Sequence, residues 1–306
     1  MTSNNTAKFT FLYLLSLIAL GFFAISAGNI LFQLINKNIA DIVESYNMLY
    51  NIQALRFAIS AIIVSAPIYF VTVWQINKNL ANGLLEKDSG IRKWLTYLIL
   101  LVSALVIIGD LIAVIYNFLN GELSLKFSLK TLTILAIAGV VFSYYFYDMK
   151  REKIEQDKVV NYYFYLTAVL AIIIFISGIF FVESPAEARQ KRLDNEVVNA
   201  LNAVESAIQE YYMTEEKLPE NLDVLIEDID YIQGKDLQNV VTKKEFEYKI
   251  TSEREYELCT EFLRSNMEDK DNYSYGYLEG RYRHEAGYDC LKKKVNDDTV
   301  KPMMVR

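Results

Sequence analysis

Histidine and cysteine are almost absent from this sequence of 306 residues, which holds one His and two Cys. With His284 as the only histidine, a bis-histidine haem and a histidine-rich metal site are excluded. The sequence also lacks a Gly-x-Ser-x-Gly elbow, a phosphate-cradling glycine loop and a His-Glu-x-x-His pair. We therefore predict no catalytic residue, no metal site and no cofactor.

Proline and glycine are scarce as well, with 4 and 12 residues, whereas hydrophobic residues make up 53% of the chain. The hydrophobic residues gather in runs long enough to cross a bilayer, which needs about 20 residues. These runs are 9–35, 57–76, 94–118, 127–147 and 161–182. The first run offers small residues at Ala24–Gly28 that a signal peptidase could cleave, but it is too long for a signal peptide. We predict five transmembrane helices.

Along the chain, loops rich in Lys and Arg alternate with loops that contain few of these residues. Two loops are basic, and their Lys and Arg residues are Lys78, Lys87, Arg92 and Lys93 after the second run and Lys150, Arg151, Lys153 and Lys158 after the fourth. The other two loops contain little more than Lys37 and Lys126. Because basic loops stay in the cytoplasm, we predict a cytoplasmic N-terminus and an extracytoplasmic C-terminus.

The two parts of the chain also differ in charge. Residues 1–182 carry 13 Lys or Arg and 10 Asp or Glu, whereas residues 183–306 carry 18 and 28. An acidic aqueous part repels the phosphates of nucleic acids, so we expect no nucleic-acid partner.

The segment Arg92–Met149 contains Gly109-Asp110, followed by Asn120-Gly121-Glu122-Leu123 and then Lys130. With "FLYLLSLIALGFFAISAGNILFQLIN" and "LRFAISAIIVSAPIYF" before it, the segment resembles a family of bacterial four-helix membrane domains of unknown function. The resemblance covers about residues 9–150. It implies a four-span bundle in a bacterial inner membrane, and it supplies no activity, cofactor or catalytic residue. The fifth run and the tail after it lie outside the resemblance.

Asp110 is a carboxylate inside the apolar stretch "LVIIGDLIAV". An unpaired carboxylate in lipid is costly, so we expect Asp110 to face the bundle and to pair with Arg56 or Lys130. Asn29 and Gln33 are predicted at the same depth, near the outer leaflet. This polar cluster is interpreted as a structural clasp; the alternatives are a ligand- or proton-responsive site and simple snorkelling of the side chain.

Pro67 falls in the middle of the second run. Proline removes one backbone donor and clashes with the preceding turn, which predicts a kink in that helix. A hinge for gating is the alternative interpretation.

After Val182 the sequence predicts a long amphipathic helix, Pro185–Glu215, which Ser184 caps. Its apolar stripe recurs at steps of three and four residues and comprises Leu193, Val197, Leu201, Val204, Ile208 and Tyr211. The stripe either packs on the domain's own sheet or forms a coiled-coil seam. Strands are predicted at 246–250, 256–262 and 288–295.

Both cysteines, Cys259 and Cys290, lie in this predicted external domain. Thiols oxidise outside the cytoplasm, so we predict one disulfide between them.

The order of a span, a long helix, "KLPENLDVL", strands and a late disulfide is similar to type IV pilins and pseudopilins over about residues 161–296. The resemblance implies a pilin-like external module. Four spans precede the helix and no prepilin cleavage site adjoins it, which argues against assembly into a pilus.

Taken together, we predict an all-α transmembrane bundle of five spans with an extracytoplasmic α+β domain. The domains are 1–150 (four spans), 151–183 (loop and fifth span), 184–296 (external domain with a long N-terminal helix and a small antiparallel sheet) and 297–306 (tail). The predicted function is a non-enzymatic anchor or scaffold that presents an external binding domain. Its partners would be the lipid bilayer and a cell-envelope protein or a second copy of the chain. The alternatives are a transporter or channel component around Asp110 and a membrane sensor or envelope enzyme.

Overall fold

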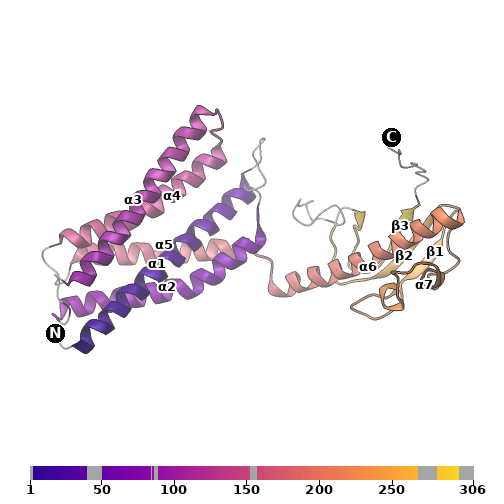
Figure 1. The fold of residues 1–306 in the computed structure, drawn as a ribbon, viewed down its shortest axis with the longest axis horizontal. Coiled ribbons are helices and arrows are strands. Elements are labelled where there is room, and N and C mark those ends of the chain that lie inside the picture. Colours follow the sequence, from indigo (N-terminus) through magenta and orange to yellow (C-terminus); the bar gives the residue numbers. More distant parts are fainter. Residues whose placement is uncertain are drawn as a thin grey trace, which may run out of the picture. The chain divides into compact units, whose positions relative to one another are not determined.

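The computed structural model describes residues 3–39, 50–83, 85, 89–151, 157–267 and 281–295. The chain divides into two compact units, residues 1–182 and 183–306 (Figure 1). The loop residues Lys87 and Lys153 and the predicted tail 297–306 lie outside the described residues.

The first unit is built from five helices that are long and apolar enough to cross a membrane. They are α1 (Ser3–Asn38), α2 (Ile52–Ala81), α3 (Gly90–Leu119), α4 (Leu125–Lys150) and α5 (Lys158–Phe180). The first four contain the predicted runs entirely, whereas α5 ends two residues before the predicted end of the fifth run. Pro67 lies inside α2, and the helix continues on both sides of it.

Local side chains explain where several of these helices begin. The side chains of Asn51, Ser124 and Asp157 accept hydrogen bonds from the first free backbone N–H groups of α2, α4 and α5. Between α3 and α4 the chain reverses through Gly121, whose φ of 72° favours glycine. The short turn makes α3 and α4 a helical hairpin.

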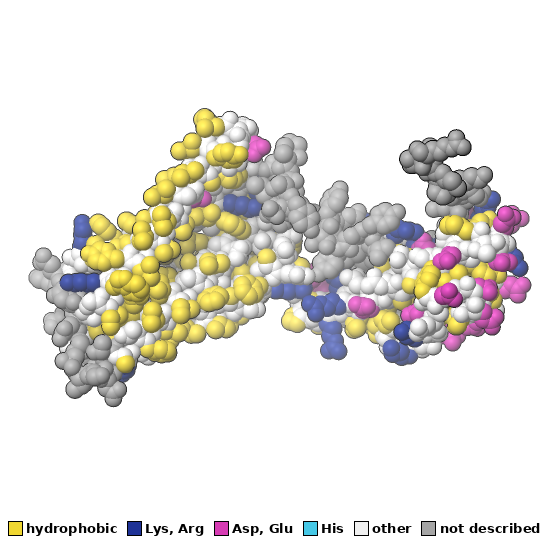
Figure 2. Space-filling view, viewed as in Figure 1, with side chains coloured by type: hydrophobic (Ala, Val, Ile, Leu, Met, Phe, Trp, Pro, Cys, Tyr) yellow, Lys and Arg dark blue, Asp and Glu magenta, His cyan; other side chains and the backbone are white. Residues whose placement is uncertain are grey.

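In the helical unit, α1 packs most closely against α2 and α3 against α4, while α4 and α5 also contact α1. Figure 1 shows the α3–α4 hairpin diverging from the other helices toward its turn. Large hydrophobic side chains remain exposed along all five helices, and they cover the visible face of this unit in Figure 2. A surface of this kind is stable in hydrocarbon and costly in water.

The second unit contains α6 (Pro185–Glu215), α7 (Val224–Asp228), the short helix η2 (Gly234–Leu237) and a three-stranded sheet. The strands β1 (Glu247–Ile250), β2 (Glu255–Phe262) and β3 (Gly287–Lys294) pair antiparallel in the order β1-β2-β3. Each strand begins and ends within one residue of its predicted bounds. At the start of α6, Ser184 Oγ accepts from the backbone N–H of Glu187, as the sequence predicts.

The apolar stripe of α6 packs within its own domain. Val197, Leu201, Val204 and Ile208 are fully buried in one core, and Leu258 of β2 belongs to the same core. Of the two alternatives that the sequence left open, the structure therefore shows packing on the sheet rather than a free coiled-coil seam.

Candidate functional site

The predicted polar cluster does not assemble around Asp110. This side chain is only 7% exposed on α3, and its Oδ2 has no hydrogen-bond partner. Within the described ranges, no ion pair joins Asp110 to Arg56 on α2 or to Lys130 on α4. Lys130 instead places its Nζ 5.8 Å from the ring centroid of Phe32. Asp110 is therefore a buried carboxylate without the partners that the sequence proposed for it.

The two amides of the predicted layer belong to α1. Gln33 is buried, and its Oε1 accepts a hydrogen bond of 2.7 Å from the backbone N–H of Asn51, at the start of α2. Asn29 is half-buried. Gln33 thus joins α1 to the end of α2 and has a structural role.

A different set of charges comes together at the opposite end of the bundle. The set consists of Arg92 from the first turn of α3, Asp148 from the last turn of α4, Arg151 after α4 and Asn77 from α2, and we call it the charge cluster. Arg92 Nη2 lies 2.7 Å from Asp148 Oδ2, and Arg151 Nη2 lies 2.8 Å from Asp148 Oδ1. Arg151 Nη2 also donates to Asn77 Oδ1 at 3.0 Å. One carboxylate thus bridges two guanidinium groups.

The charge cluster is buried. Arg92, Asp148 and Arg151 are 6%, 9% and 7% exposed. Two guanidinium groups face one carboxylate, and the Nε of Arg151 is buried without a hydrogen-bond partner. Such an arrangement holds α2, α3 and α4 in register, because removing one charge would leave another buried and uncompensated.

Tyrosines cover the charge cluster on the side of the bundle interior. Tyr144 and Tyr145 line the same small cavity as Asn77 and Asp148. Tyr163 of α5 donates to Ser143 Oγ at 3.2 Å.

Next to the tyrosines, a cavity of about 390 Å³ runs between α1, α2, α4 and α5. Its lining is almost wholly apolar, and its few polar side chains are Thr133, Thr167, Tyr69, Tyr144, Tyr145 and Tyr163. A second cavity of about 30 Å³ shares Tyr144 and Tyr145 with the first and is also lined by Asn77 and Asp148. The second cavity therefore adjoins the first at these tyrosines, and both polar and apolar side chains line it.

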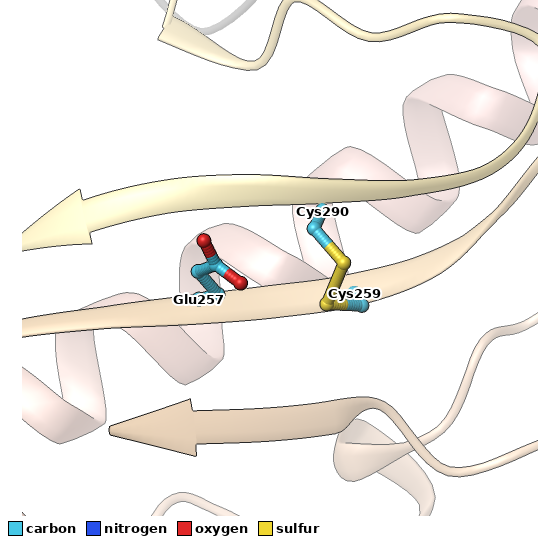
Figure 3. A group of neighbouring side chains, drawn as sticks. All are labelled: Glu257, Cys259 and Cys290. Atoms are coloured by element: carbon cyan, nitrogen blue, oxygen red, sulfur yellow. A yellow bond between two sulfur atoms is a disulfide. The ribbon is translucent and has the colours of Figure 1, made fainter. Parts of the chain in front are cut away.

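The second unit contains the predicted disulfide between Cys259 and Cys290. The two residues are directly opposite each other in the β2–β3 register, and Glu257 lies on the same face two residues before Cys259 (Figure 3). Carboxylate and sulfur atoms lie within 4.8 Å of one another here, as they would around a metal ion. Because metal ions bind thiolates, this group is not a metal site while the sulfurs are joined.

Buried polar residues fix the segment that follows β2 and the segment that precedes β3. His284 stacks on Phe262 with ring centroids 3.6 Å apart, and its Nδ1 lies 2.7 Å from the carbonyl of Tyr282. The carboxylate of Asp194 on α6 accepts from the backbone N–H groups of Leu263 and Arg264 at 2.8 and 2.9 Å. Burial lowers the pKa of His284 and raises that of Asp194.

Glu205 of α6 makes a second set of contacts with the same segments. It forms ion pairs with Arg281 and with Lys293, the latter at 3.0 Å, and it accepts from the hydroxyl of Tyr282. Lys293 also lies 3.5 Å from the centroid of the Tyr282 ring. These contacts attach α6 to the sheet, which is a structural role.

Residues 10–145 match the family model described as a domain of unknown function, DUF5671. The match extends from α1 through most of α4, so it includes the candidate spans α1 to α4 and leaves α5 and the second unit outside. No curated protein and no solved structure matches the chain, and the predicted likeness to pilins is not shown. The resemblance stated for residues 9–150 is confirmed as far as a domain of unknown function.

Proposed function

We propose that this chain is a multi-pass protein of a bacterial inner membrane that anchors a disulfide-bonded binding domain on the extracytoplasmic side. The observation that carries the proposal is the disulfide Cys259–Cys290 in the unit that follows five candidate spans. Disulfides persist in oxidising compartments. An odd number of spans places the two ends of a chain on opposite sides of the membrane, and the basic loops favour a cytoplasmic N-terminus. Three independent features thus support one orientation.

The second unit has the features of an independently folded binding domain. It has its own hydrophobic core, and one face of its sheet is covered by α6. The other face carries the disulfide within a ladder of opposite charges, including Glu255–Lys294 at 3.4 Å and Glu257–Lys292 at 4.0 Å. A polar, neutralised sheet face suits reversible contact with an envelope protein. In this proposal the pilin-like order of elements serves as a fixed module and not as a pilus subunit.

The transporter alternative has less support. The large cavity of the helical unit contains no charged residue in its lining, and Asp110 is not among the lining residues. A pathway for an ion needs polar groups along its length. In the described part of the chain, the cavity is therefore better suited to an apolar molecule than to an ion.

The orientation is tested by labelling the full chain in spheroplasts with a membrane-impermeant maleimide. Cys259 and Cys290 are the only cysteines, so no other thiol contributes. We expect labelling only after an impermeant reductant is added. As a matched control, Ser89→Cys in a chain without the native cysteines is expected to react only after the membrane is permeabilised. Reaction of the native cysteines without reductant, and only after permeabilisation, would contradict the proposal.

A further inference from the structure

We propose that the second unit binds one zinc ion through Cys259, Cys290 and Glu257 when the disulfide between the two cysteines is reduced. The oxidised form and the zinc-bound form exclude each other, because zinc binds thiolates and a disulfide has none. This site goes beyond the proposed function, since its chemistry is the same on either side of a membrane.

The sheet holds the two sulfur ligands opposite each other. Cys259 on β2 and Cys290 on β3 are direct partners in the antiparallel register, and their Cα atoms lie 4.0 Å apart. The neighbouring pair, Leu258 and Leu291, belongs to the hydrophobic core on the opposite face of the sheet, so the strands stay paired after reduction. With zinc–sulfur bonds of about 2.3 Å, two sulfurs in a tetrahedral site lie about 3.8 Å apart. Rotation of the two side chains reaches this separation without a change of register.

Glu257 supplies the third ligand. It lies two residues before Cys259 and on the same face of β2 (Figure 3). A carboxylate oxygen and the two sulfurs lie within 4.8 Å of one another. The carboxylate is held loosely, since its ion pair with Lys292 measures 4.0 Å and the Lys292 side chain is 86% exposed. The lysine can therefore move into solvent while the carboxylate turns toward a cation.

The set of ligands favours zinc over the common hard cations. Thiolates bind zinc and softer metals, whereas magnesium and calcium require oxygen ligands. Cys290 and Glu257 are half-buried, so solvent reaches the site and a water molecule can complete the four ligands that zinc prefers. The two cysteines are 31 positions apart in the sequence, so the register of the sheet, and no local motif, brings the ligands together.

Formation of the site is a two-electron reduction followed by metal binding. A dithiol reductant breaks the S–S bond by two successive thiol–disulfide exchanges, becomes a disulfide itself and leaves one thiol on each cysteine. Zinc then replaces the two thiol protons, which pass to solvent. The bound ion would link β2 to β3 in the reduced chain, as the disulfide does in the oxidised chain.

Titration of the purified full chain with cobalt(II) tests the proposal, because cobalt bound to thiolates gives a charge-transfer absorption band. The chain is first reduced with a phosphine, which is then removed in the absence of oxygen. We expect the band to saturate at one cobalt per reduced chain, to disappear when zinc is added, and to be absent from the oxidised chain. Cys290→Ser is expected to abolish the band. This variant lacks the disulfide just as the reduced chain does, so the two share the same folded reference.

The carboxylate is tested by Glu257→Gln. Loss of a partner outside the ligand shell already costs about 10–100-fold in metal affinity, so loss of this ligand should weaken cobalt binding at least as much. Glu261→Gln is the matched control. Glu261 lies on the same strand and face, two residues after Cys259, and its carboxylate pairs with Lys244 at 2.7 Å. This variant is expected to keep the affinity of the unchanged chain.

Thermal unfolding of each reduced variant identifies any that fails to fold. A reduced chain without the cobalt band, or an oxidised chain that gives the same band, would overturn the site. Equal cobalt affinity in folded Glu257→Gln and in the unchanged chain would overturn the assignment of Glu257 as the third ligand.

Discussion

Arg92 in the first turn of α3 donates to the carboxylate of Asp148 in the last turn of α4 at 2.7 Å, across 56 positions of sequence. The same guanidinium nitrogen also donates to the backbone carbonyl of Asp148 at 3.0 Å. The pair closes the α3–α4 hairpin at the end opposite its turn. Since Arg151 reaches the other carboxylate oxygen, Asp148 pairs with both arginines at this end of the bundle.

Asp148→Ala is expected to destabilise the chain by about 3–5 kcal/mol, because two buried guanidinium groups lose their shared counter-charge. Thermal unfolding in detergent measures the effect. Glu122→Ala, an exposed acidic residue in the α3–α4 turn, is the control and should change stability little. An Asp148→Ala chain as stable as this control would show that the charge cluster has no structural role.

Removal of Asp110 is expected to be neutral or stabilising. The carboxylate is buried on α3 without an ion-pair partner among the described residues, so Asp110→Asn removes a desolvation cost and breaks no ion pair. Yield of folded protein by size-exclusion chromatography measures the outcome. A large loss of folded protein in Asp110→Asn would indicate that the predicted pairing with Arg56 or Lys130 forms in the membrane.

Reduction of the disulfide is expected to lower the stability of the second unit by about 3–4 kcal/mol, since the bridge joins residues 31 positions apart. Cys259→Ala, Cys290→Ala and the double variant should be destabilised equally, because each lacks the same bond. Unfolding curves with and without reductant provide the measurement. A reductant effect that persists in the double variant would contradict this account.

The second unit is expected to lose stability in acid because of His284. Burial holds its pKa below the ordinary value of 6.5, so the unfolded chain binds the proton more readily than the folded chain. The contribution is complete above about pH 6.5 and is lost as the pH falls through the lowered pKa. Asp194, with its raised pKa, acts in the opposite direction.

Limited proteolysis of the full chain between pH 7 and pH 5 follows this loss. The His284→Phe variant keeps an aromatic ring against Phe262 and cannot titrate, so its protection should change less over the same range. An equal change in the variant and the unchanged chain would assign the pH dependence to other groups.

The helices and strands could be predicted because their signals are local. Runs of apolar residues define α1 to α5, and Ser184 followed by Pro185 defines the start of α6. The pairing of Asp110 with Arg56 or Lys130 is absent from the described residues. The sequence prediction used only the depth of each residue in the membrane. Residues at one depth meet only if their helices are neighbours and their side chains face each other, and α3 packs mainly on α4.

The charge cluster was missed for a related reason. Arg92 and Arg151 were counted as loop charges that determine orientation, although both are buried. Asp148 was the available signal, since it is an acidic residue in the last turn of an apolar helix, shortly before Arg151. Its contact with Arg92 depends on how the hairpin closes, which no local pattern encodes.

The position of the sulfur bridge has a consequence for how the domain matures. Leu258 and Leu291 face α6 and its core, so the adjacent pair Cys259 and Cys290 faces the opposite side of the sheet. The hydrophobic core can therefore assemble while both thiols are still reduced, and an oxidase can reach Cys290, which is only half-buried, without opening the core. The disulfide would then form late in folding and stabilise strands that are already paired.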